Sequence, residues 1–179
     1  DLAGSWLAAM PSPGAHAAPQ IAVVVGRHLF YNNSAFDDAG RGRDDDDAIA
    51  PDKTPLLWGN AATQANYSSY SRGLNGVMID VAGLSAAVVV DASDFALRVG
   101  NSNAPATWTA AAAPQSVSVR RGEGVDGSDR ITLVWADGAI LNEWLEVTVL
   151  ATGLGLIAND VFYFGNAAGD TGDSTWHAA

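Results

Sequence analysis

Hydrophobic and polar side chains alternate most regularly between residues 128 and 152, which predicts two β-strands joined by a turn. Asp137-Gly138 marks the turn, because Gly accepts a positive φ at no steric cost. On the first strand Trp135 lies on the same face as the apolar residues Ile131 and Leu133, so we expect its ring in the core. On the second strand Trp144 falls on the polar face, and we expect it to be partly exposed. The second strand has Leu141, Leu145, Val147 and Val149 on its apolar face, and Asn142, Trp144, Glu146 and Thr148 on its polar face.

The same period of two recurs elsewhere in the chain. Residues 21–31 are nearly continuous in apolar character, which is typical of a central strand. Residues 74–82 place Val77, Ile79 and Val81 on one face. Further strands are expected at residues 86–90, 94–99, 115–120 and 161–164. About eight short strands without an amphipathic helix predict an all-β fold, an antiparallel β-sandwich of jelly-roll or immunoglobulin-like topology.

The 179 residues are enough for one domain with a hydrophobic core. Residues 1–20, rich in Ala and Pro and without periodicity, are expected to form a linker or N-terminal arm. The sandwich is expected over residues 21–166, followed by a C-terminal linker over 167–179. No apolar run is long enough for a transmembrane helix, and the start of the chain lacks the basic region of a signal peptide, as in a mature or excised segment.

Acidic residues outnumber basic ones, with a formal net charge of −11. Lys53 is the only lysine, so the clustered positive charge needed to bind nucleic acid or an anionic membrane is missing. The chain has no Cys, which excludes disulfides and thiolate metal sites. We therefore expect no nucleic-acid partner and no membrane insertion, and a bound Ca²⁺ is the obvious additional stabiliser for an Asp-rich chain.

A polar loop over residues 32–53 carries most of the candidate calcium ligands. Ca²⁺ takes six to eight oxygen ligands, and carboxylates are the strongest of them. The alternative is a solvated run of like charges, and the spacing is not that of an EF-hand. The candidate metal ligands are Asp37, Asp38, Asp44, Asp45, Asp46, Asp47 and Asp52.

Several aromatic residues lie in polar segments, where a ring could stack on a sugar while neighbouring side chains bind its hydroxyls. The alternative for any single Trp is that it closes an end of the sandwich. The net charge favours a neutral or cationic glycan over a sulfated or uronic one, unless Ca²⁺ bridges the anion. The candidate ligand-binding residues are Trp58, Asn66, Tyr67, Tyr70, Arg72, Trp108, Asn142 and Trp144.

The sequence predicts no catalytic residue. Glu143 and Glu146 are three apart on a strand, so they face opposite sides and cannot flank one glycosidic bond. The three His residues show no metal-binding spacing, and no nucleophile elbow or phosphate-binding glycine loop occurs. An Asp pair brought together by folding remains open.

Several stretches together carry a resemblance to a known kind of module: residues 29–37, 48–54, 65–80, and 160–166 followed by 169–174. They resemble a β-sandwich module of large secreted bacterial proteins of planctomycete type, located just before a dockerin-type calcium repeat. The resemblance covers roughly residues 25–174. Such proteins often carry carbohydrate-active domains, so it implies a secreted or cell-surface location and a carbohydrate-binding module. The dockerin repeat itself is missing, and its function is not carried over.

Three hypotheses for the function follow. The leading one is a non-catalytic extracellular module that binds polysaccharide, contains a structural Ca²⁺ and acts as a monomeric part of a larger protein. The second is a structural or adhesive spacer of immunoglobulin or cohesin-like type. The third is an enzyme that acts on polysaccharide.

Overall fold

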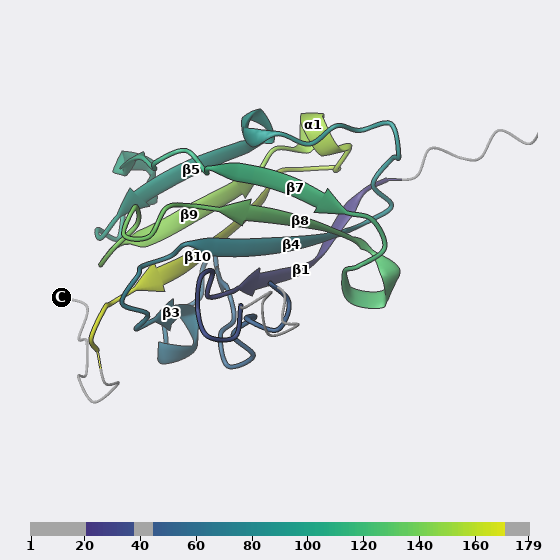
Figure 1. The fold of residues 1–179 in the computed structure, drawn as a ribbon. Helices are drawn as coiled ribbons and strands as arrows, with labels where there is room; N and C mark the ends of the chain where they lie inside the picture. The colour runs from purple at the N-terminus through teal and green to yellow at the C-terminus, as the bar shows by residue number, and fades with distance from the viewer. Residues whose placement is uncertain (1–20, 38–44, 171–179) are drawn as a thin grey trace, which may run out of the picture.

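The computed structural model describes residues 21–37 and 45–170, and its regular structure is nearly all β (Figure 1). Two sheets form an antiparallel β-sandwich, which confirms the predicted fold class with ten strands instead of about eight. The four-stranded sheet has the order β1 (Val23–Leu29), β4 (Gly76–Ala82), β8 (Asp129–Val134), β7 (Ser116–Arg120). The six-stranded sheet has the order β2 (Leu56–Leu57), β10 (Asp160–Asn166), β9 (Trp144–Val149), β5 (Phe95–Gly100), β6 (Thr109–Ala110), with β3 (Tyr67–Ser68) parallel to β10.

Short helical turns connect the strands. The single α-helical turn described is α1, Ala151–Leu154, and 3-10 turns span Gln64–Asn66, Ala92–Asp94, Pro105–Thr107 and Val125–Gly127. No helix in the described ranges is long and apolar enough to cross a membrane. The predicted N-terminal arm and most of the predicted C-terminal linker lie outside the described residues.

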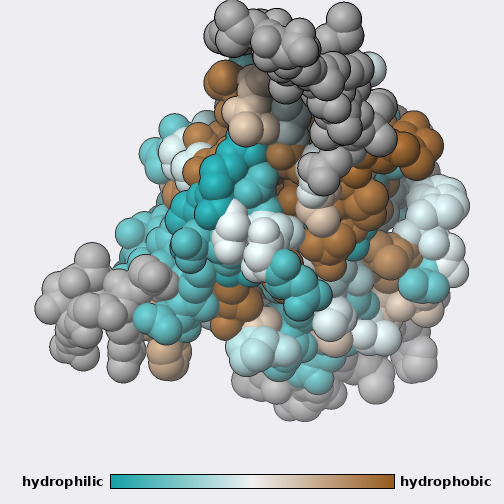
Figure 2. All heavy atoms as spheres, turned by 90° about the vertical axis from the view of Figure 1, so that its right-hand side faces the viewer, coloured by the Kyte–Doolittle hydropathy of each residue, from teal (hydrophilic) through white to brown (hydrophobic). Residues whose placement is uncertain are grey.

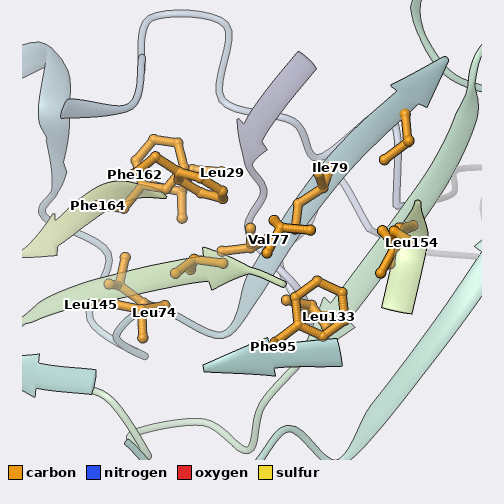
Figure 3. Close-up of a cluster of buried hydrophobic side chains, with 14 of the residues drawn as sticks. Leu29, Leu74, Val77, Ile79, Phe95, Leu133, Leu145, Leu154, Phe162 and Phe164 are labelled. Atoms are coloured by element: carbon orange, nitrogen blue, oxygen red, sulfur yellow. The ribbon is translucent and has the colours of Figure 1, made fainter. Parts of the chain in front are cut away.

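The core lies between the two sheets, where the inward faces of β4 and β8 meet those of β9 and β10 (Figure 3). The predicted inward residues Val77, Ile79 and Val81 of β4 are fully buried. Trp135 is also buried, as predicted, and its indole N–H donates to the carbonyl of Ala112 at 2.8 Å. The ring is thus accommodated in the core without an unsatisfied donor.

The predicted hairpin at Asp137-Gly138 is wrong. β8 pairs with β4 and β7, whereas β9 pairs with β10 and β5, so the two strands belong to different sheets. Gly138 does adopt a positive φ of 76°, but its N–H donates to the carbonyl of Arg72 and not across a hairpin. The dipeptide makes a turn, and long-range hydrogen bonds direct the chain from one sheet to the other.

Where the chain crosses from one sheet to the other, the buried face of the second strand also begins later than predicted. Leu141 is 39% exposed, contrary to the prediction, because Asn142 has a left-handed backbone (φ 56°) that interrupts the extended phase. From Trp144 onward the period of two holds, with Leu145 and Val147 buried. The alternation within each strand therefore agrees with the prediction, whereas the connection between the two strands differs from it.

The predicted strand at residues 86–90 is not formed, and the chain makes a turn there instead. Val88 and Val90 pack against the core while Val89 is 86% exposed, so the side chains alternate as expected. Val88 N–H, however, donates to the carbonyl of Ser85 within a local turn. Alternation alone does not make a strand, because a strand also needs a neighbour for its backbone groups.

Strand β1 lies at the edge of the four-stranded sheet, which corrects the prediction of a central strand. Val24 packs against the core, but Val23 and Val25 are 52% and 45% exposed, and a bulge interrupts the pairing with β4 between Val24 and Gly26. Figure 2 looks onto this end of the sandwich and shows hydrophobic residues gathered at the surface. A cavity of about 200 Å³ lies here between residues 22–24 and 156–160.

The outer face of the four-stranded sheet is covered by the segment that follows β1. Phe30 and Ala48 bury themselves against Met78 of β4. Asp80, which points to the same side as Met78, is buried beside Arg130 of β8. The outer face of the six-stranded sheet has a different composition, and the candidate site lies there.

Candidate functional site

A row of aromatic and glycine residues crosses the outer face of the six-stranded sheet. In the strand register Tyr67 of β3 lies beside Gly165 of β10, Gly165 beside Trp144 of β9, and Trp144 beside Gly100 of β5. Buried Leu145 alternates with half-buried Trp144 on β9, so Trp144 points away from the core. We call Tyr67, Gly165, Trp144, Gly100 and the ring of Trp108, described next, the aromatic row.

The two glycines provide the space in which the indole rings rest on the sheet. A Cβ at Gly165 would lie 3.0 Å from ring atoms of Trp144 and 2.9 Å from the Cβ of Tyr67. A Cβ at Gly100 would lie only 2.5 Å from the ring of Trp108. Glycine inside a strand commonly marks such a close approach. Each indole thus has one side against the backbone and remains half-buried.

Trp108 reaches the row from the segment between β5 and β6. It follows the 3-10 turn Pro105–Thr107, and its indole N–H donates to the carbonyl of Ser102 at 3.0 Å. Its ring meets that of Tyr163 edge to face, with centroids 5.9 Å apart. Because the ring position is set by a hydrogen bond and a ring contact, the surface it presents is already organised.

A polar row runs beside the aromatic row, two residues further along the strands. Tyr163 of β10, Glu146 of β9 and Arg98 of β5 are neighbours in register. The Tyr163 phenol donates to Oε2 of Glu146 at 2.9 Å. Burial and this carboxylate together raise the pKa of Tyr163 to about 12, so the phenol stays protonated and donating. The guanidinium of Arg98 donates to the carbonyl of Ala106 at 3.3 Å.

A second phenol–carboxylate pair lies at the end of the aromatic row. The hydroxyl of Tyr67 donates to Oδ2 of Asp170 at 3.0 Å, and burial together with this carboxylate raises the pKa of Tyr67. The outer face therefore combines ring surfaces with two carboxylates that are held as hydrogen-bond acceptors. This combination suits a ligand with both C–H faces and donor groups.

The structure brings three of the eight predicted ligand-binding residues into the aromatic row: Tyr67, Trp108 and Trp144. Trp58 follows the edge strand β2 and is 77% exposed, outside the row. The two predicted asparagines have structural partners. Asn66 is buried and donates to the carbonyl of Thr54, and the Asn142 side chain accepts from the N–H of Ala168.

Tyr70 and Arg72 belong to a separate cluster at one end of the sandwich. The ring of Tyr70 packs on that of Tyr31 with centroids 4.9 Å apart, and its hydroxyl donates to the carbonyl of Asn32. Arg72 pairs with Asp137 at 2.8 Å. Asp137 also accepts from the amide of buried Asn75, and together these contacts tie three loops together.

The described part of the acidic loop is held by cations of the protein itself. Asp46 forms ion pairs with Arg120 and Arg130. Burial opposes ionisation of Asp46, but the two guanidinium groups outweigh it and lower its pKa. Asp52 pairs with Lys53, and Asp37 accepts from the backbone N–H of Asn33.

The remaining predicted metal ligands do not complete a site in the described ranges. Asp45 and Asp47 also have interacting partners, and Asp38 and Asp44 lie outside the described residues. Within residues 21–37 and 45–170, no three His, Asp or Glu side chains gather closely enough to hold a metal ion. The described carboxylates thus do not by themselves fit a calcium centre.

Sequence reasoning missed five residues of this face: Tyr163, Glu146, Arg98, Gly100 and Gly165. A usable signal existed for Tyr163, because alternation with the core residues Phe162 and Phe164 places it on the outer face of the sheet, where it is 5% exposed beside Trp108. Glycine within two predicted strands was a second signal, since strand glycines often accommodate a neighbouring group.

No known protein family matches this chain, and searches of characterised proteins and of solved structures find no match.

Proposed function

We propose that the aromatic row binds a polysaccharide and that this domain is a carbohydrate-binding module of a secreted or cell-surface protein. The observation that carries the proposal is the alternation of aromatic and glycine residues in one row across β3, β10, β9 and β5. A sugar ring stacks its C–H face on an aromatic ring, and its hydroxyls then reach polar groups at the rim. The row offers both kinds of contact.

The row offers one continuous apolar surface. A Cβ at Gly165 would lie 3.0 Å from the ring of Trp144 and 2.9 Å from the Cβ of Tyr67, so the Trp144 ring leans across β10 toward Tyr67. The two side chains can therefore contact the C–H face of the same sugar or of adjacent sugars in one chain. The rings are supported by backbone and ring contacts, which limits the conformational entropy lost on binding.

Affinity electrophoresis against a panel of soluble glycans tests the proposal. We expect retardation of the natural protein by at least one glycan, and Trp144→Ala should weaken it at least about fivefold, as for an interface residue worth more than about 1 kcal/mol. Trp58→Ala is the matched control, because it removes a more exposed Trp outside the row. Binding unaffected by Trp144→Ala, Trp108→Ala and Tyr67→Ala would refute the role of the row.

Gly165→Ala provides a second test that keeps every aromatic residue. Its Cβ would lie 2.9 Å from the Cβ of Tyr67 and 3.0 Å from the ring of Trp144, so both side chains must shift and binding should fall. If no glycan retards the natural protein, the structural or adhesive spacer becomes the better hypothesis. Release of reducing sugars by the natural protein would instead support the polysaccharide-active enzyme.

A further inference from the structure

Among the described strands that end a sheet, β1 offers the longest and most apolar edge. β2 and β6, which end the six-stranded sheet, have two residues each. β7, at the opposite edge of the four-stranded sheet, exposes Ser116 and Ser118. β1 has seven residues and exposes Val23 and Val25. Native proteins commonly cover, charge or shorten such an edge, because its backbone groups and apolar side chains invite association.

A cavity adjoins this edge where β1 approaches the six-stranded sheet. The N–H of Ala22 donates to the carbonyl of Gly155 at 3.2 Å, and Nε of Arg27 donates to Asp160 at 2.7 Å. The cavity of about 200 Å³ is lined by residues 22–24 and 156–160, and its charged residue, Asp160, is neutralised by Arg27. An apolar cavity of about 150 Å³ is large enough to bind benzene, so this one can take a large apolar side chain.

The described part of the chain begins beside this cavity. Ile21 is 55% exposed and directly precedes the lining residues of β1. Residues 1–20 lie outside the described residues, and their sequence has no Lys or Arg and one acidic residue, Asp1. The large apolar residues of this segment are Leu2, Trp6, Leu7 and Met10. A nearly uncharged segment with apolar residues is therefore tethered next to an apolar cavity.

The sequence of this segment also contains a signal for chain reversal. Pro13-Gly14 is typical of a type II turn, in which Pro suits the second position and Gly the third. Six residues separate Trp6 from Pro13, and six separate Gly14 from Ile21. A turn at this dipeptide would therefore return Trp6 to the level of Ile21, beside the cavity.

We infer that residues 1–20 of the same chain cover the apolar edge of β1 and that Trp6 occupies the cavity. The inference is independent of the proposed function. Covering Val23, Val25 and the 82% exposed Ile157 removes apolar surface from water, which favours the contact. A tethered segment is favoured over a second copy, because tethering gives an effective concentration in the millimolar range, whereas each copy brings a net charge of −11.

Disulfide cross-linking in the full chain tests the inference, since the natural sequence has no Cys. Ser5→Cys, next to Trp6, is paired with Ala158→Cys, an exposed lining residue of the cavity. This pair should close at least about tenfold faster than the same pair with Trp6→Ser added, because docking raises the effective concentration of the segment. Trp6→Leu, which keeps an apolar side chain, should retain faster closure than Trp6→Ser.

Ser5→Cys with Asn103→Cys is the matched control. Asn103 is exposed and follows the end of β5 that pairs with Trp144, whereas the cavity adjoins the opposite end of the six-stranded sheet, at Asp160. Trp6→Ser should not slow closure of this control pair, because the segment does not dock there. Thermal melts show whether each variant is folded at the temperature of the measurement.

Binding of the apolar dye ANS is a second measurement that needs no engineered Cys. Trp6→Ser should uncover the edge and raise dye fluorescence above that of the natural protein. Phe36→Ser is the control, because it removes a 58% exposed aromatic residue from the segment after the other end of β1, and it should not raise the fluorescence.

Three outcomes would overturn the inference. The first is a closure rate of the Ser5→Cys/Ala158→Cys pair that Trp6→Ser leaves unchanged. The second is dye fluorescence equal in the natural protein and in Trp6→Ser. The third is a dimer, seen by light scattering, that Val25→Lys dissociates, since a second copy would then cover the edge.

Discussion

On each outer face of the sandwich an aromatic ring packs on a glycine, but only one of the two rings is fully buried. On the four-stranded sheet, the ring of Phe30 rests on Gly76, where a Cβ would lie 2.4 Å from the ring. On the six-stranded sheet, Trp144 rests on Gly165 in the same way. Phe30 is fully buried together with Ala48 of the segment that follows β1, whereas Trp144 remains half-exposed. An aromatic ring seated on glycine is thus part of a core on one face and an open surface on the other.

The carboxylates on the two faces also differ in burial and in the number of their hydrogen-bond donors. On the covered face Asp80 is fully buried and accepts from Arg130 at 2.7 and 2.8 Å, from the backbone of Val125 and from His28 at 3.0 Å. On the open face Glu146 has Tyr163 as its donor and stays half-buried. A covered charge must be satisfied within the protein, while an uncovered one retains capacity for a ligand. The comparison therefore indicates a structural role for the covered face and leaves the open face as the location of the proposed binding site.

The largest expected effect is the loss of Asp80. Asp80→Ala leaves the Arg130 guanidinium buried without its principal partner, which typically destabilises a protein by about 3–5 kcal/mol. Urea denaturation measures the change, and Glu123→Gln, an exposed acidic site, should shift the free energy of unfolding by less than about 0.5 kcal/mol. A loss below about 1 kcal/mol for Asp80→Ala would show that the covered network is not structural.

Two tryptophans distinguish the core from the open face. Trp135→Ala empties a fully buried site and should cost about 3–5 kcal/mol in the free energy of unfolding. Trp144→Ala removes a half-buried ring and should cost much less, while weakening glycan binding. Thermal and urea unfolding of both variants check this. Equal destabilisation would mean that Trp144 serves mainly to hold the fold.

Calcium remains a prediction from the acidic loop. If an ion binds only the folded protein, it raises stability by about 2.7 kcal/mol at a hundredfold excess over its dissociation constant. The melting temperature should then fall in EDTA and return with CaCl₂. An unchanged melt after exhaustive chelation, with no metal found by elemental analysis, would leave Arg120 and Arg130 as the partners that hold Asp46 on the covered face.

High pH should lower the free energy of unfolding through a tyrosine of the open face, and this is the smallest of the four expected effects. The pKa of Tyr163 is raised to about 12, above the ordinary value of 10.0 that an unfolded chain would have. A raised pKa contributes stability that is present below about pH 10 and is lost as the pH rises toward 12. Tyr163→Phe should flatten this part of the stability profile, whereas Tyr31→Phe, which keeps the Tyr163 phenol, should not. Identical alkaline profiles for the natural protein and Tyr163→Phe would contradict the assignment.

The partners of the acidic loop could not be predicted from the sequence. The run from Asp44 to Asp47 suggested calcium ligands, because carboxylates in one loop are neighbours along the chain. In the fold Asp46 instead meets Arg120 and Arg130, which are more than seventy residues away. No local pattern reports such partners, so a charge run alone does not distinguish a metal site from an ion-pair anchor.

The alternation of apolar and polar residues by itself determined the fold class and the orientation of most strand side chains. It placed Trp135 inside and Trp144 outside, because successive side chains of a strand point to opposite faces whatever its neighbours are. Only the tertiary structure decided which strands are neighbours. The hairpin predicted at Asp137-Gly138 does not form for this reason, since β8 pairs with β4 and β7 in one sheet while β9 pairs with β5 and β10 in the other. The pairing of β10 with β3 and β9, and of β9 with β5, brings Tyr67, Gly100, Trp144 and Gly165 into one row, because strand register is set by backbone pairing and core packing across the fold.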